Sequence, residues 1–115
     1  MMDFFFARQA IFDKNGDIIG YELFHRSSAV NKYQKPDGDI ATLELLFKII
    51  QTNGIERVAN GKLVFVNYTR NLLLQNIPLI MPSKTAVVEI HEDVQAERQV
   101  VQACRNLSQK GYVIV

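Results

Sequence analysis

A turn signal near the N-terminus places the strongest constraint on how this chain can fold. Two apolar, aromatic-rich runs, residues 4–12 and 18–26, flank the polar segment 13–17, which contains the pair Asn15-Gly16. An Asn-Gly pair supplies the positive φ angles that a tight hairpin turn requires. The N-terminal part of the chain therefore predicts an antiparallel β-hairpin.

Beyond the hairpin, segments with helical character alternate with short apolar runs. Helices are predicted over residues 40–53, 70–76 and 93–109. Strands are predicted over residues 62–67, 86–90 and 111–115, which are apolar on both faces, as strands of a covered parallel sheet are. This alternation predicts an α/β fold whose strands run parallel after the hairpin.

Three residues of the type that caps helices mark the expected helix starts. Asp39 precedes the first helix, Thr69 precedes the second and Asp93 opens the third. The polar stretch 27–39 between the hairpin and the first helix is long for a simple connection. We therefore interpret it as either a functional or a flexible loop.

Composition and charge narrow the class of protein. The 115 residues are 48% hydrophobic and 22% charged, with a net charge of +1, which is typical of one globular unit. The small net charge argues against non-specific binding to nucleic acid or to an anionic membrane, and no apolar run approaches the ~20 residues of a membrane span. A single cysteine, Cys104, fits a reducing compartment. We therefore expect a cytoplasmic protein without nucleic-acid or membrane partners.

Three residues with oxygen donors stand at equivalent places in the predicted sheet. Glu22, Asn67 and Glu89 each lie at or next to the C-terminal end of a strand. In a (β/α) barrel, these strand ends converge on the active site. Two carboxylates and an amide oxygen suit Mg²⁺ or Mn²⁺, because hard cations prefer oxygen ligands. The pattern therefore predicts a metal site.

Structural roles for the same residues remain open at this point. Glu22 could form an ion pair with Arg26 at the end of its strand. Asn67 could cap the turn that follows it, and Glu89 could bond to a neighbouring backbone group.

The remaining chemically active side chains give weaker signals. His25 and His91 are the only histidines, and the chain has no paired cysteines, so we do not expect a zinc site. His91 suits a helix-capping or surface role. Cys104 falls on the apolar face of a predicted helix and is expected to belong to the core.

Three motifs follow one another along the chain. The first is FARQAIFD at residues 6–13 followed by GYELFHR at residues 20–26, the second is FVNYT at residues 65–69 and the third is VEIHE at residues 88–92. Together they resemble the motifs of EAL domains, the bacterial cyclic di-GMP phosphodiesterases, and most closely the branch in which an EAL domain precedes an HDOD output domain. The resemblance implies a modified (β/α)₈, or TIM-type, barrel whose first strand is antiparallel. Residues 1–115 would form the N-terminal half of that domain.

The resemblance also implies roles for individual residues. Glu22, Asn67 and Glu89 would bind Mg²⁺ or Mn²⁺ in the full domain, and Arg26 would contact a phosphate of cyclic di-GMP. The usual Glu-Ala-Leu signature is replaced here by a sequence with larger side chains after Glu22, and His91 stands where the family has threonine.

Further family residues are absent from the chain as given, among them a pair of aspartates that the family carries after position 115. We therefore expect a signal-transduction module that is catalytically inactive by itself. The alternative is part of a metal-dependent, cyclic di-GMP-specific phosphodiesterase.

The strand pattern also suggests self-association. Predicted strands that are apolar on both faces need cover on both sides. Leu63, Phe65 and Val87 are candidates for a face that the predicted helices leave bare, and residues 112–115 present a free strand edge. We therefore expect a homodimer formed through these strand faces or this edge.

Overall fold

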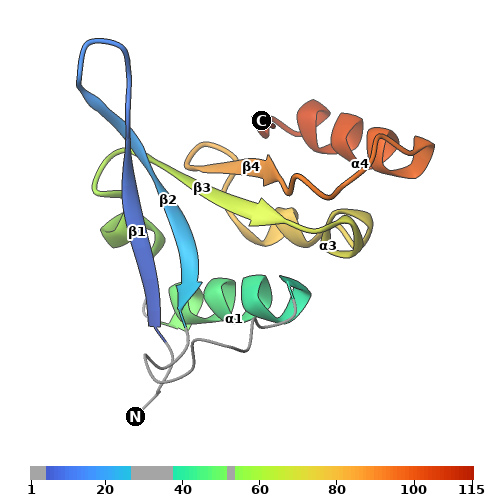
Figure 1. Ribbon diagram of the computed structural model, residues 1–115, viewed down its shortest axis with the longest axis horizontal. Helices are drawn as coiled ribbons and strands as arrows, with labels where there is room; N and C mark the ends of the chain where they lie inside the picture. Colours follow the sequence, from blue (N-terminus) through green and yellow to red (C-terminus); the bar gives the residue numbers. More distant parts are fainter. Residues whose placement is uncertain (1–4, 27–37, 52–53) are drawn as a thin grey trace.

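The structure is a computed structural model that describes residues 5–26, 38–51 and 54–115. A four-stranded sheet of order β1-β2-β3-β4 runs through it (Figure 1). Strands β1 and β2 pair antiparallel, whereas β3 and β4 extend the sheet parallel to β2. The strands are β1 (Phe5–Phe12), β2 (Ile18–Arg26), β3 (Leu63–Tyr68) and β4 (Ala86–Ile90). The predicted α/β fold, with parallel strands after an antiparallel hairpin, is confirmed.

The hairpin turn forms where the Asn-Gly pair predicted it. Gly16 has a φ of +85°. Asp13 Oδ1 accepts hydrogen bonds from the backbone N–H groups of Asn15, at 2.8 Å, and Asp17, at 3.0 Å. An aspartate that bonds to the backbone two residues on is a common turn device. The local sequence therefore closes this turn without help from the rest of the chain.

Helical segments connect and follow the parallel strands. They are α1 (Gly38–Gln51), α2 (Ile55–Ala59), α3 (Arg70–Leu74), the 3₁₀ turn η1 (Ile77–Ile80) and α4 (Arg98–Gln109). The predicted capping role of Thr69 is confirmed, because its hydroxyl accepts a hydrogen bond from the N–H of Leu72. The segments α2 and η1 were not predicted, because elements of five and four residues are too short to show a period.

The prediction that Asp93 opens the last helix is wrong. Helix α4 begins at Arg98, with Glu97 as its N-cap residue. The N–H of Asp93 donates to His91 Nδ1 at 3.1 Å, and the N–H of Val94 donates to the His91 carbonyl at 3.0 Å. These bonds close a turn directly after β4, so the helix cannot start until the chain has left that turn.

Asp39 also serves a purpose other than the predicted one. Helix α1 starts one residue earlier, at Gly38. The Asp39 carboxylate accepts hydrogen bonds from the Thr69 hydroxyl and from the Asn71 side-chain amide. These bonds hold the pKa of Asp39 below its usual value. The residue therefore joins the start of α1 to the start of α3.

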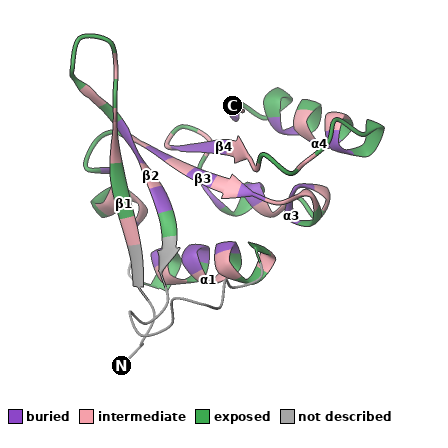
Figure 2. Ribbon diagram, viewed as in Figure 1, coloured by how far each residue is buried: buried purple, intermediate pink, exposed green. Residues whose placement is uncertain are grey.

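The helices pack against one face of the sheet. Val64, Val66 and Tyr68 of β3 are at most 1% exposed and share a core cluster with Leu46 of α1 and Leu72 of α3. The residues that alternate with them along β3 point to the opposite face and are only partly buried. Figure 2 shows buried stretches on the strands and on α1. The sheet therefore has one covered face and one more open face.

The C-terminal residues continue the sheet beyond β4. Ile114 forms a parallel bridge with Val88, and the N–H of Ile90 donates to the carbonyl of Val115 at 3.0 Å. The buried Tyr112 donates its hydroxyl hydrogen to the carbonyl of Met81 at 2.5 Å. The predicted strand 111–115 is thus present as a bridge to β4 rather than as a full strand.

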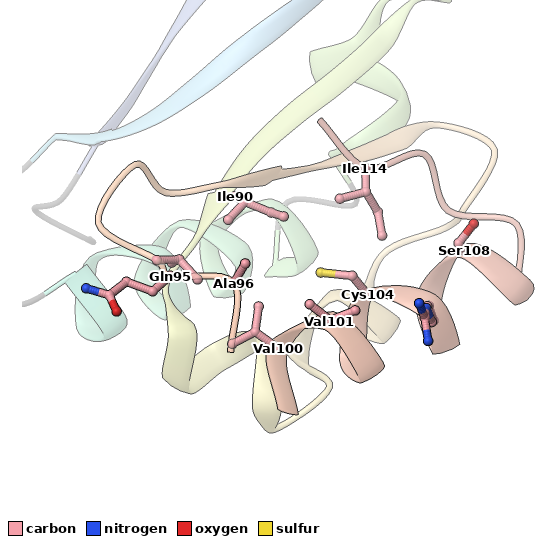
Figure 3. A pocket seen from close by; sticks show the side chains of 10 residues that line it. Ile90, Gln95, Ala96, Val100, Val101, Cys104, Ser108 and Ile114 are labelled. Atoms are coloured by element: carbon pink, nitrogen blue, oxygen red, sulfur yellow. The ribbon is translucent and has the colours of Figure 1, made fainter. Parts of the chain in front are cut away.

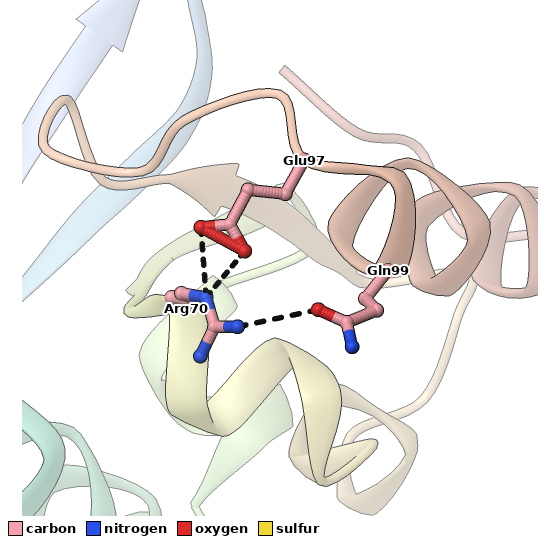
Figure 4. Close-up of polar contacts among 3 residues, drawn as sticks. All are labelled: Arg70, Glu97 and Gln99. Atoms are coloured by element: carbon pink, nitrogen blue, oxygen red, sulfur yellow. Dashed lines mark hydrogen bonds and ion pairs between the residues drawn. The ribbon is translucent and has the colours of Figure 1, made fainter.

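A charged contact joins the two helices that follow β3 and β4. The Nε of Arg70 donates to the Glu97 carboxylate at 2.9 Å and 3.2 Å, and its Nη2 donates to Gln99 Oε1 at 3.3 Å (Figure 4). The pair is well exposed, so it contributes at most about 1 kcal/mol to stability. Its role is to fix the start of α4 beside the start of α3.

Two further expectations bear on the whole chain. The four strands form an open sheet in the part of the chain that the structure describes, so the half-barrel stays a prediction. None of the helices in that part is long and apolar enough to cross a membrane.

Candidate metal and ligand site

The register of the sheet places the three predicted ligands on one face. Glu22 pairs with Phe65 across β2 and β3, and Asn67 pairs with Glu89 across β3 and β4. Directly paired residues in parallel strands point to the same side, and residues two apart in one strand do so as well. Glu22, Asn67 and Glu89 therefore all project from the face opposite the helices.

Two of these side chains interact directly. The carboxyl groups of Glu22 and Glu89 form a hydrogen bond, although β3 lies between their strands, so both side chains reach over β3. The pKa of Glu89 is raised to about 7, chiefly by burial and further by the hydrogen bond and the negative charge of Glu22. The Glu89 carboxyl therefore keeps its proton up to about pH 7.

One oxygen of this pair has no bonding partner. Glu89 Oε1 is buried and makes no hydrogen bond to the residues that the structure describes. A buried acceptor left without a partner costs free energy, which a bound ion would recover. The carbonyl oxygen of the Asn67 amide can lie beside it, because Asn67 is the residue paired with Glu89. This set of oxygen donors fits a hard divalent cation.

The candidate site offers a divalent cation only two charged ligands. No group of three or more His, Cys, Asp or Glu side chains that could hold a metal ion occurs within the described residues. The candidate set differs from such a group because its third donor is an amide. The described donors would therefore supply part of a coordination shell, with water or a ligand completing it.

A glycine shapes the same face, and sequence reasoning missed it. A Cβ added at Gly20 would lie 2.7 Å from the Leu63 carbonyl oxygen and 2.8 Å from a ring carbon of Phe65. The Phe65 ring therefore lies directly against the bare backbone of Gly20, two residues before Glu22. A glycine inside a strand is itself the signal for such a close approach.

The alternative structural roles fare differently. Asn67 is not needed to cap the following turn, because Thr69 does so. The buried oxygen of Glu89 has no backbone partner among the described groups. Arg26 ends β2 opposite Phe5, but its side chain lies outside the described residues, as does the polar loop 27–37. The Glu22–Arg26 ion pair and the phosphate contact therefore stay predictions.

The other two candidate residues, His91 and Cys104, make contacts that belong to the fold. His91 Nδ1 accepts the N–H of Asp93 in the turn after β4, and α4 begins only at Arg98, so His91 bonds a turn and does not cap the predicted helix. Cys104 is half-buried, and burial raises the pKa of its thiol. It lines an apolar pocket of about 410 Å³ between α4 and the strands, together with Ile90, Val100 and Ile114 (Figure 3). Cys104 packs against the buried core cluster and is not one of its fully buried members, so the predicted core role is confirmed in part.

Two bacterial proteins are similar to nearly the whole chain. The uncharacterised protein YuxH of Bacillus subtilis is 37% identical over 113 residues, which are 98% of this chain and 28% of YuxH. The cyclic di-GMP phosphodiesterase CdgJ of Vibrio cholerae is 33% identical over 110 residues, which are 94% of this chain and 25% of CdgJ. The chain matches no protein-family model and no solved structure. It is therefore a distant homologue of a cyclic di-GMP phosphodiesterase and spans about a quarter of the length of these relatives.

Proposed function

We propose that this chain is the N-terminal part of an EAL-like domain that acts in bacterial cyclic di-GMP signalling. The observation that carries the proposal is the meeting of Glu22 and Glu89 over β3, with an unpartnered buried oxygen, on the open face of the sheet. The similarity to CdgJ over 94% of the chain supports the same assignment.

The fold proposal follows from the order of the strands. Strands β2, β3 and β4 are parallel neighbours in sequence order, and the C-terminal residues bridge β4 in the same sense. Further parallel units added in the same order would extend the sheet toward a (β/α) barrel that begins with the antiparallel strand β1. The open face, which carries Glu22, would then become the barrel interior.

Within that domain, the chain's own oxygen donors would hold Mg²⁺ or Mn²⁺. Glu22 and Glu89 would bind through carboxylate oxygens and Asn67 through its amide oxygen. A cation at this place would polarise a bound phosphate or water. Arg26, at the end of β2, would contact a phosphate of cyclic di-GMP, because a guanidinium binds phosphate oxygens in pairs.

We propose that this chain acts in signal transduction by binding rather than by catalysis. Glu22, Asn67 and Glu89 could anchor a cation, but they fill only part of its coordination shell. Other groups would have to complete the shell and position a water molecule for hydrolysis. The alternative, catalysis by the longer protein, is supported by the similarity to CdgJ, a cyclic di-GMP phosphodiesterase.

Metal binding is the direct test of the site. Titration of the chain with Mn²⁺ at pH 7.5, followed by calorimetry, should show one site. Glu22→Gln and Glu89→Gln should each weaken the affinity at least about tenfold, because each removes a charged ligand. Glu56→Gln changes an exposed carboxylate on α2 and should bind like the wild type. Equal affinities for all four chains would refute the site.

The absence of turnover is a separate expectation. The chain alone should release no linear dinucleotide from cyclic di-GMP in the presence of Mg²⁺ or Mn²⁺, because it lacks most of a catalytic shell. Chromatography of the reaction after overnight incubation measures this. Turnover that Glu22→Ala abolishes would show that the chain is itself a phosphodiesterase, and the binding-only proposal would be wrong.

A further inference from the structure

Helix α1 carries a second apolar surface besides the one that packs on the sheet. Its buried residues include Leu45, Leu46 and Ile49. A separate row, here called the apolar row, consists of Ile40, Leu43, Phe47 and Ile50, which are 54%, 40%, 55% and 52% exposed. Single exposed apolar residues are ordinary, but four in line along one helix indicate a contact surface.

The spacing of the apolar row indicates which partner fits it. Successive members are three, four and three residues apart, which is the spacing of a coiled-coil seam. The order of intervals is the same in both directions. A second copy of the helix running antiparallel therefore places Ile40 opposite Ile50 and Leu43 opposite Phe47, so the row is complementary to itself. Antiparallel helices also oppose their dipoles favourably.

The surface continues from α1 onto η1. Ile50 and Ile80 line one pocket of about 250 Å³, and Leu79 and Ile80 are 43% and 49% exposed. With these two residues, the exposed apolar surface amounts to roughly 600 Å² per chain, at the upper end for a typical monomer. Two copies would bury about 1,200 Å², the lower bound of specific interfaces.

Two other ways of covering the row are less favourable. Additional units would join the sheet at its two edges, beside β1 or beyond β4, whereas α1, which carries the row, packs on the inner strands β2 and β3. The strand faces predicted as the dimer interface are better covered than the row, since Val87 is 3% exposed and Leu63 and Phe65 are partly buried. The row of α1 is therefore the surface that gains most from a partner.

We propose that two copies of this chain associate through the apolar rows of α1, packed antiparallel about a two-fold axis. This inference is independent of the proposed function, because it uses no residue of the candidate metal site. Metal binding and dimer formation can therefore fail separately.

Sedimentation equilibrium at about 100 µM, a concentration at which an interface of this size should be populated, tests the proposal. The wild type should be dimeric, and Phe47→Glu should weaken association at least about a hundredfold, because it buries two charges near the axis. Val113→Glu is the matched control: Val113 is 57% exposed beside β4 and lies outside the row. A wild-type monomer, or a dimer that Val113→Glu but not Phe47→Glu dissociates, would overturn the proposal. Circular dichroism confirms that each variant is folded.

Cross-linking tests the antiparallel orientation. The row is centred on position 45, so the two-fold axis passes close to this position. Residue 44 is one position from the axis and therefore lies near residue 44 of the partner chain. In a Cys104→Ser background, Glu44→Cys should form an intermolecular disulfide under mild oxidation. Gln51→Cys, at the far end of α1, should not, because antiparallel packing separates the two copies of that position. Equal cross-linking of both variants, or of Gln51→Cys alone, would exclude the antiparallel row.

Discussion

Gly20→Ala should destabilise the chain by about 3 kcal/mol, because overpacking at a rigid contact has this order of cost. The added methyl would lie 2.7 Å from the backbone oxygen of Leu63 and 2.8 Å from the Phe65 ring. The ring could rotate away, but the oxygen belongs to the neighbouring strand and could move only if β2 and β3 separate. Urea unfolding followed by circular dichroism measures the change in the free energy of unfolding.

Gly38→Ala is the matched control for this substitution. The Cβ added there would meet a single side-chain atom, a methyl of Thr69 at 3.0 Å, which can shift slightly. Its free energy of unfolding should stay within about 1 kcal/mol of the wild type, because alanine also favours the helix. Equal losses in the two variants would show that Phe65 does not lie against Gly20. Because Gly20 is two residues from Glu22, Gly20→Ala should also weaken Mn²⁺ binding.

Stability should fall as the pH rises from about 4.5 to about 7, because of Glu89. Its pKa is raised from 4.5 in the unfolded chain to about 7 in the folded chain. Between these values the unfolded chain has lost a proton that the folded chain keeps. The stabilisation is therefore complete below pH 4.5 and is lost as the pH rises through 7. The full shift corresponds to about 3 kcal/mol, which solvent screening of this partly exposed group reduces to on the order of 1 kcal/mol.

Glu89→Gln should remove this part of the pH dependence, since glutamine does not titrate. Other carboxylates titrate in both proteins, so the quantity to measure is the difference between wild type and variant in urea unfolding at pH 5 and pH 8. The variant should lose on the order of 1 kcal/mol less between these values. Glu56→Gln should follow the wild type. Parallel curves for wild type and Glu89→Gln would show that the pKa of Glu89 is not raised in the folded chain.

Features set by neighbouring residues were predictable from the sequence. The Asn15-Gly16 turn, the Thr69 cap and the alternation of strands with helices all depend on local patterns, and the structure confirms them. The start of α4 was not predictable in this way. Asp93 has the right side chain for a cap, but its backbone N–H is held by the ring of His91. This side-chain-to-backbone bond spans only two residues, and helical periodicity does not show it.

The candidate site was predictable only in part. Strand alternation places Asn67 on the same face as Phe65, and the register agrees. The contact between Glu22 and Glu89 depends instead on β2, β3 and β4 being neighbours in that order and on both side chains reaching over β3. Pairing order is a property of the whole sheet, so no local pattern could reveal the contact that helps to raise the pKa of Glu89. The same holds for the apolar row, whose exposure depends on how α1 rests on the sheet.

The raised pKa of Glu89 would link any cation bound beside it to protons. A cation that binds the Glu89 carboxylate would displace its proton, so binding below about pH 7 would release acid to the buffer. The apparent affinity of the proposed site would therefore fall as the pH drops below about 7, at constant cation concentration. Such a site would respond to pH as well as to the cation.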